Sequence, residues 1–121
     1  MSAKKQISKI LLVDDDHSVR RICRIVLERA GFGVIEADSA HAAQIAWEAH
    51  AHGIDLLVTD YEMPGLTGLQ LSVLLRNAKP ELKVLLISGH LRESIPHCIA
   101  FLQKPFSASD LIEAVGRCLF P

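Results

Sequence analysis

Acidic, hydroxyl and amino side chains directly follow several apolar runs of this 121-residue chain. They are Asp14, Asp15, Asp60, Ser88 and Lys104. Carboxylate oxygens suit a hard divalent cation, and Mg²⁺ fits a partly hydrated site held by one or two carboxylates. A carboxylate beside a cation and a lysine can attack a phosphoryl group and form an acyl phosphate. That chemistry requires a fold that brings these side chains together.

The elements that must position these side chains are strands and helices in alternation. Asp55 to Val58 is a short apolar run, which is typical of a strand buried on both faces of a parallel sheet. Strands are predicted over residues 8–13, 33–37, 55–58, 82–88 and 99–103. Strands that alternate with helices through short connections indicate a parallel sheet covered on both faces, a doubly wound α/β domain.

Apolar periodicity predicts the helices and the faces that they bury. The first helix is expected to be capped by Asp16, to end at Gly31, and to bury Val19, Ile22, Cys23, Val26, Leu27 and Ala30. The second starts at Ser39 and ends by Gly53, with Trp47 beside an apolar stripe of Ala42, Ile45, Ala46 and Ala49. A third helix spans residues 68–77. The last helix begins at Ser107, and the residues that it is expected to bury are Leu111, Ile112, Val115 and Leu119.

The strands of a parallel sheet end at one rim, where open α/β folds bind their ligands. Three carboxylates at one rim repel one another, so at least one pKa rises unless a cation is present. Lys104 adds a compact positive charge and Ser88 a hydroxyl. Two other interpretations stay open, namely a purely structural cation site and Asp60 as a cap for the following loop or helix.

Four motifs of this chain resemble those of the receiver domain of two-component response regulators (the CheY-like family), and the resemblance covers essentially all 121 residues. The motifs are LVDDD at 12–16, DYEMPGLTG at 60–68, LISG at 86–89 and LQKPF at 102–106. The resemblance implies a flavodoxin-like, five-stranded sheet of order 2-1-3-4-5. It also implies a single receiver domain over residues 1–121, for which we expect no output domain.

The same resemblance implies a role for each site residue. Asp60 would accept a phosphoryl group from a phosphohistidine of a sensor histidine kinase or phosphotransfer protein. Asp15, Asp60 and the main-chain carbonyl of Glu62 would bind Mg²⁺ or Mn²⁺, with Asp14 acting through water. Lys104 would contact the phosphoryl group.

Further residues are expected to take part in switching. The resemblance implies a cis bond before Pro105, with Ser88 as the switch hydroxyl and Phe101 as the aromatic that moves with it. Glu62 and His90 each lie two positions beyond a site residue, so we expect them to flank the phosphoryl group. There they would orient or exclude attacking water.

The segment between Ser88 and Lys104 departs from the family pattern. The two residues are 16 positions apart, which is short for the family, and Pro96 interrupts the interval. We therefore expect the fourth helix of the family fold to be shortened or missing, with an irregular and mobile segment in its place. Partners are then expected to bind the first and last helices instead of the usual signalling surface.

The amino-acid composition limits the cellular location and the classes of partner that are expected. Thirteen basic and fourteen acidic residues give a net charge of −1, and no basic cluster indicates direct nucleic-acid binding. No apolar run has the roughly 18 residues needed to cross a membrane. Three cysteines without a CxxC pair are expected to be small buried residues in a reducing compartment, which indicates the cytoplasm.

The site residues are compatible with three function classes. The favoured one is a signalling phospho-acceptor that catalyses only its own phosphorylation and dephosphorylation and then switches the binding of a downstream protein. A phosphohydrolase would need a second acid at the nucleophile and a substrate cap. A pure interaction domain would have no need of the intact acidic, hydroxyl and lysine set.

Overall fold

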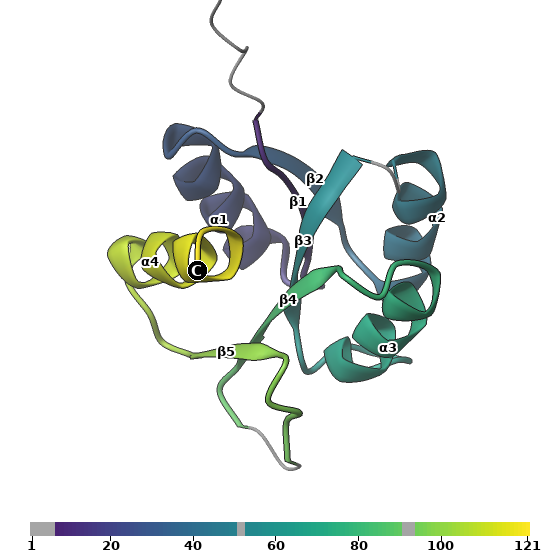
Figure 1. The fold of residues 1–121 in the computed structure, drawn as a ribbon. Helices are drawn as coiled ribbons and strands as arrows, with labels where there is room; N and C mark the ends of the chain where they lie inside the picture. Colours follow the sequence, from purple (N-terminus) through teal and green to yellow (C-terminus); the bar gives the residue numbers. More distant parts are fainter. Residues whose placement is uncertain (1–6, 51–52, 91–93) are drawn as a thin grey trace, which may run out of the picture.

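Across residues 7–50, 53–90 and 94–121, which the computed structural model describes, five parallel strands form one sheet in the order β2-β1-β3-β4-β5 (Figure 1). The strands are β1 Lys9–Val13, β2 Gly33–Ala37, β3 Ile54–Asp60, β4 Lys83–Ser88 and β5 Ala100–Gln103. The order confirms the predicted flavodoxin-like sheet. Its central strand, β3, carries an acidic residue as its last member, at the carboxyl rim.

Helices cover both faces of the sheet, as predicted (Figure 1). The helices are α1 His17–Arg29, α2 Ala40–His50, α3 Gly68–Ala78 and α4 Ala108–Leu119. Alternate residues of β1 enter two different cores: Leu11 and Val13 pack with α2 and α3, whereas Ile10 and Leu12 pack with α1 and α4. Burial on both sides explains why the strands are almost continuously apolar.

Local signals set several of the helix boundaries. Asp16 Oδ1 accepts hydrogen bonds from the backbone N–H groups of Ser18 at 3.0 Å and Val19 at 3.2 Å, as predicted for the cap of α1. Gly31 follows α1 with a φ of 100°, a conformation that suits glycine. Ser107 and Asp110 form the predicted capping box of α4. These caps place the rim loops at defined positions along the chain.

The predicted stripe of α2 is confirmed for Ala42 and Ala46, which are partly buried against the core, and is wrong for Ile45 and Ala49. Trp47 is only 6% exposed and packs with Ala40 and Ala43 against the sheet, whereas Ile45 is 57% exposed and Ala49 is exposed as well. In a helix this rich in alanine several faces are similarly apolar, so periodicity could not select one. The large ring of Trp47 buries the most surface, and the sheet contact selects the face that carries it.

Two isoleucines that were predicted to face inward also lie on the surface, and so does Ala30 at the end of α1. Ile22 of α1 is 62% exposed and Ile112 of α4 is 38% exposed, while Cys23 and Leu111 next to them are buried. Only a narrow stripe of each helix contacts the sheet. The outward isoleucines therefore remain available on the two helices that were predicted to serve partners.

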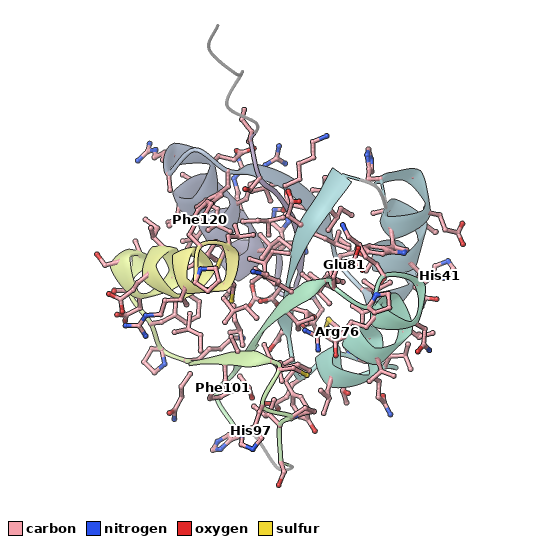
Figure 2. All side chains as sticks on the ribbon, in the orientation of Figure 1. His41, Arg76, Glu81, His97, Phe101 and Phe120 are labelled. Carbon is pink, nitrogen blue, oxygen red and sulfur yellow. The ribbon has the colours of Figure 1, made fainter. Side chains whose placement is uncertain are left out.

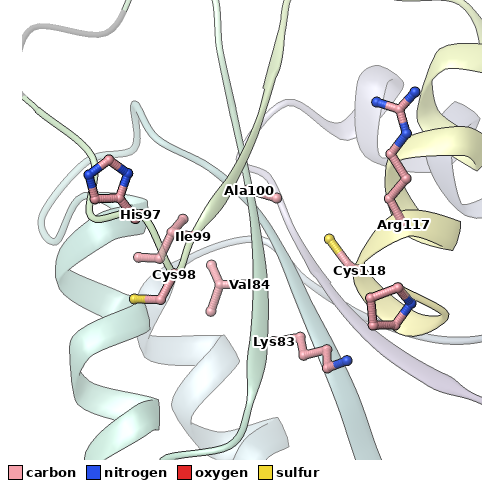
Figure 3. A pocket seen from close by; sticks show the side chains of 9 residues that line it. Lys83, Val84, His97, Cys98, Ile99, Ala100, Arg117 and Cys118 are labelled. Atoms are coloured by element: carbon pink, nitrogen blue, oxygen red, sulfur yellow. The ribbon is translucent and has the colours of Figure 1, made fainter.

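The expectation that all three cysteines are buried is wrong for Cys98. Cys23 is buried and Cys118 is partly buried, but Cys98 is exposed and accepts a hydrogen bond at Sγ from Arg76 Nη1 at 3.0 Å. Cys98 and Cys118 line the same groove from different elements, with Ala100 lying between them (Figure 3). All three thiols are free.

No helix is present between β4 and β5 in the described residues 89–90 and 94–99, in agreement with the prediction of a shortened or missing helix. The chain makes a turn instead, in which the Ile99 N–H donates to the Pro96 carbonyl at 3.0 Å. Leu91, an apolar residue of the same segment, lies outside the described residues. Among the helices that the structure describes, none is long and apolar enough to span a membrane.

Candidate functional site

The carboxyl rim of the sheet gathers the carboxylates of Asp14, Asp15 and Asp60. One carboxylate oxygen from each lies within 4.8 Å of the others. Asp14 and Asp60 are buried and Asp15 is exposed, so the cluster is open to solvent on one side. The ends of β1 and β3, which pair as neighbours, bring these residues together.

Backbone hydrogen bonds hold the two acidic strand ends in place. The Asp14 N–H donates to the Ala37 carbonyl at 3.2 Å, and Asp14 Oδ1 accepts from the Asp16 N–H at 2.9 Å. Beyond Asp60, the Tyr61 N–H donates to the Ile87 carbonyl at 2.8 Å. The carboxylates thus project from ordered backbone and not from a free loop.

Lys104 joins the cluster from the end of β5. Its side-chain Nζ lies 3.5 Å from Asp60 Oδ2, and its backbone N–H donates to the Ser88 carbonyl at 3.0 Å. The Lys104–Pro105 peptide bond is cis, in agreement with the expectation from the resemblance. The lysine therefore supplies a positive charge directly beside the central carboxylate.

Ser88 is fully buried and is engaged by its own turn. Its Oγ accepts from the His90 N–H at 3.0 Å, and it lies 2.8 Å from the His90 carbonyl and 3.4 Å from Glu62 Oε1. A hydroxyl has one proton, so it donates to one of these acceptors at a time, and the shorter contact to His90 is the better one. The structure thus brings Ser88, Glu62 and His90 together.

Burial and mutual repulsion shape the acidity of the site. Desolvation, followed by the charge of Asp14, raises the pKa of Asp60 to about 6, while Lys104 opposes the shift. Desolvation also raises the pKa of Asp14. Such shifts are expected of neighbouring carboxylates with too little positive charge around them.

The donor set fits a hard divalent cation. Three carboxylates offer oxygen ligands at close range, and one solvent-facing side leaves room for waters, as Mg²⁺ or Mn²⁺ requires. A bound dication would also offset the repulsion that raises the pKa of Asp60. Asp14, Asp15 and Asp60 are therefore the residues able to hold the ion.

Phe101 and Pro105 complete the predicted set. Phe101 is 38% exposed and extends from β5 at the edge of the sheet (Figure 2). Pro105 lines an apolar groove of about 310 Å³ between α1 and the end of β5. Other residues along the groove include Val19, Ile22, Cys23 and Lys104.

Two contributors were missed as site residues by sequence reasoning. Gly68 packs so closely on the end of β3 that a Cβ atom there would overlap the Asp60 carbonyl oxygen. Its place at the end of the DYEMPGLTG motif was the available signal. Arg20 donates from Nη1 to the Asp14 carbonyl at 2.8 Å, and nothing in the pattern of an amphipathic helix distinguishes this arginine.

Replacing Gly68 by alanine is expected to destabilise the fold by about 1–3 kcal/mol, because the methyl group has no space and the Asp60 backbone must shift. The added carbon would also lie 2.9 Å from Leu86 Cδ1. Gly116→Ala in α4 is the matched control, since nothing lies within 4 Å of its Cβ position and alanine favours a helix. Urea unfolding of both variants would measure this. Equal stability of the two would contradict the packing argument.

Comparisons with known proteins agree with this geometry. Residues 10–116 match the response regulator receiver domain. The chain is 34% identical over 109 residues to the CAI-1 autoinducer sensor kinase/phosphatase CqsS of Vibrio cholerae, covering 90% of this chain and 16% of CqsS. It is 30% identical over 117 residues to the response regulator receiver protein CpdR of Brucella abortus, covering 92% of this chain and 96% of CpdR.

A solved structure, the receiver domain of the hybrid histidine kinase CckA, is also similar. It has a TM-score of 0.83 and 34% sequence identity, with 93% of this chain and 99% of that chain covered. Several other relatives are longer proteins, of which this chain spans about a quarter. The similarity thus covers one domain that occurs both alone and within larger proteins.

Proposed function

Because the chain belongs to the response regulator receiver domain family, we propose that Asp60 is the residue that accepts the phosphoryl group. Receiver domains are signalling phospho-acceptors of two-component systems. The observation that carries the proposal is the surroundings of Asp60. This buried carboxylate ends the central strand, 3.5 Å from Lys104 and beside two further carboxylates.

The reaction is a phosphoryl transfer between two side chains. A carboxylate oxygen of Asp60 attacks the phosphorus of a phosphohistidine, the P–O bond forms as the P–N bond breaks, and the electron pair stays on the imidazole. Asp15, Asp60 and the Glu62 carbonyl would hold Mg²⁺ or Mn²⁺, with Asp14 acting through water. When bound, the ion supplies positive charge for the phosphoryl oxygens. Lys104, whose Nζ lies 3.5 Å from Asp60 Oδ2, would add positive charge for the same oxygens.

Ser88, Glu62 and His90 are proposed to control the phosphorylated state. Ser88 can donate to a phosphoryl oxygen only after it gives up its donor contact in the 88–90 turn. That change would pull on the turn and be transmitted towards Phe101 on the adjacent strand β5. Glu62 and His90 line the opening beside the site, where they would orient or exclude water.

The groove between α1 and the end of β5 is the proposed docking place of the phosphodonor. It is continuous with the site because Lys104 lines both, and the exposed Ile22 and Pro105 give it an apolar wall. A helix of a sensor histidine kinase or phosphotransfer protein that presents its phosphohistidine fits these requirements. We place the protein in the cytoplasm with that donor. We infer that it catalyses only its own phosphorylation and dephosphorylation and binds no nucleic acid directly.

The proposed function is tested by incubating the protein with phosphoramidate and Mg²⁺ and locating the modified residue by mass spectrometry. The expected result is one added phosphoryl group, on Asp60, that depends on the cation. Refusal of every phosphodonor would overturn the proposal in favour of an interaction domain. Sustained turnover of phosphomonoesters would favour a phosphohydrolase.

Lys104→Ala is expected to slow phosphorylation by roughly a hundredfold while the fold remains intact. Loss of one group that stabilises the transferring charge typically has this size, and the side chain is not part of the core. Lys83→Ala removes the same charge at the opposite end of the sheet and serves as the control. The rate from phosphoramidate and the thermal unfolding midpoint would be measured. A wild-type phosphorylation rate for Lys104→Ala would show that this lysine is only a surface charge with no role in the transfer.

A further inference from the structure

Arg20 lies behind the acidic loop and contacts three elements at once. Its Nη1 donates to the Asp14 carbonyl at 2.8 Å and its Nε to Glu36 Oε1 at 2.9 Å. Its Nη2 lies 3.0 Å from His17 Nδ1. The side chain is 12% exposed. This guanidinium thus connects the end of β1, strand β2 and the first turn of α1.

Glu36 holds the guanidinium in place from the side opposite the loop. Burial acts to raise the pKa of Glu36, but hydrogen bonds from Arg24 and Arg20 outweigh it and lower that pKa. The second arginine bonds the other carboxylate oxygen, from Arg24 Nη1 to Glu36 Oε2 at 2.6 Å. Glu36 therefore stays ionised as an anchor, and Arg20 has little freedom to leave the Asp14 carbonyl.

The contact with the Asp14 carbonyl bears directly on Asp15. The carbonyl of Asp14 and the nitrogen and Cα of Asp15 lie in one planar peptide unit, so holding the oxygen limits rotation of that plane and thereby fixes where the Asp15 Cα lies. Asp15 is the exposed member of the carboxylate cluster. Of the three carboxylates, it therefore depends most on its backbone for its position.

We propose that Arg20 is a positioning residue that holds the Asp14–Asp15 peptide so that the Asp15 carboxylate is preorganised for a divalent cation. The proposal rests on the phospho-acceptor function given above. Residues that orient metal ligands through such contacts commonly change metal affinity strongly when they are removed. Arg20 would do so without touching the cation, and its positive charge is balanced by Glu36.

The test is the Mg²⁺ affinity of Arg20→Ala, measured on the full chain by amide chemical-shift titration. The matched control is Arg24→Ala, which removes the same charge from the same helix and breaks contacts with Glu36 and Glu28. We expect about tenfold weaker Mg²⁺ binding for Arg20→Ala. For Arg24→Ala we expect a clearly smaller loss, because Glu36 keeps its hydrogen bond to Arg20 and Arg20 keeps its contact with the Asp14 carbonyl. Arg20→Lys keeps the charge but has no planar fork, so it should bind more weakly than wild type.

A second readout separates positioning from general loss of structure. With phosphoramidate, Arg20→Ala should phosphorylate slowly at low Mg²⁺ and approach the wild-type rate when Mg²⁺ saturates, because Asp60 and Lys104 are unchanged. Equal Mg²⁺ affinities of the Arg20→Ala and Arg24→Ala variants would overturn the proposal. If Arg20→Ala does not fold, the Arg20→Lys comparison with wild type decides in the same way. Failure of the wild-type protein to bind Mg²⁺ or accept phosphate would instead count against the proposed function.

Discussion

Replacing Asp60 by asparagine is expected to abolish the Mg²⁺-dependent uptake of a phosphoryl group from a small donor such as phosphoramidate. The amide has nearly the same shape, so the fold and the contacts of β3 should persist. It has no anionic oxygen, however, and an amide oxygen is a far weaker nucleophile than a carboxylate. Intact-mass spectra of the wild-type and variant proteins under the same conditions would show the difference.

Asp55→Asn provides the control for this loss. Asp55 belongs to the same strand but lies at its amino end, where Oδ2 accepts a hydrogen bond from the Lys9 N–H at 2.9 Å. It should therefore be phosphorylated on Asp60 like the wild type. Labelling of Asp60→Asn at the wild-type level would show that another residue, such as Asp14 or Asp15, is the acceptor.

The same Asp60→Asn substitution is expected to stabilise the metal-free fold at neutral pH. Burial and the charge of Asp14 raise the pKa of Asp60 from 3.8 to about 6, so the folded state binds this proton more tightly than the unfolded chain does. Above pH 6 the ionised carboxylate then destabilises the fold, by at most about 3 kcal/mol from the size of the shift. Asparagine removes that charge and should recover part of this free energy.

The stability difference between Asp60→Asn and the wild type is expected to depend on pH. As the pH falls from 6 towards 3.8, wild-type Asp60 becomes protonated in the folded state first, so the stability advantage of Asp60→Asn should shrink and disappear. Mg²⁺ should also reduce the advantage, because it stabilises the ionised wild-type cluster. Urea unfolding in EDTA at pH 7.5 and pH 4, and again with Mg²⁺, would test this. A variant less stable than the wild type at pH 7.5 in EDTA would contradict it.

The described residues 89–90 and 94–99 form no helix between β4 and β5, and this bears on which surfaces stay open to partners. Phe101 and the edge of β5 are not covered by a helix from the described residues 89–90 and 94–99 (Figure 2). The exposed Ile22 and Ile112 lie on α1 and α4, the two helices that we predicted to replace the usual signalling surface. Greater mobility of the segment after Ser88 stays a prediction.

The amino-acid sequence by itself determined the strands, their ends and the carboxyl rim. These features depend on neighbours in the chain: an apolar run ends at Asp14 or Asp60, a cap residue such as Asp16 starts a helix, and Pro96 prevents one. Because parallel strands all end at the same rim, local signals were sufficient to bring distant carboxylates and Lys104 into one site. The motifs that carry the family resemblance are short for the same reason.

Only the tertiary structure decided which helix faces are buried and what holds the site residues. The choice of Trp47 over Ile45 depends on the sheet that α2 packs against, and periodicity in an alanine-rich helix does not contain that information. Side chains that cross between elements hold the site residues. Arg20 bonds to Asp14 and Glu36, and Ser88 is held within its own turn and lies near Glu62. Such contacts depend on distances and directions that exist only after the elements have packed, so no pattern along the chain specifies them.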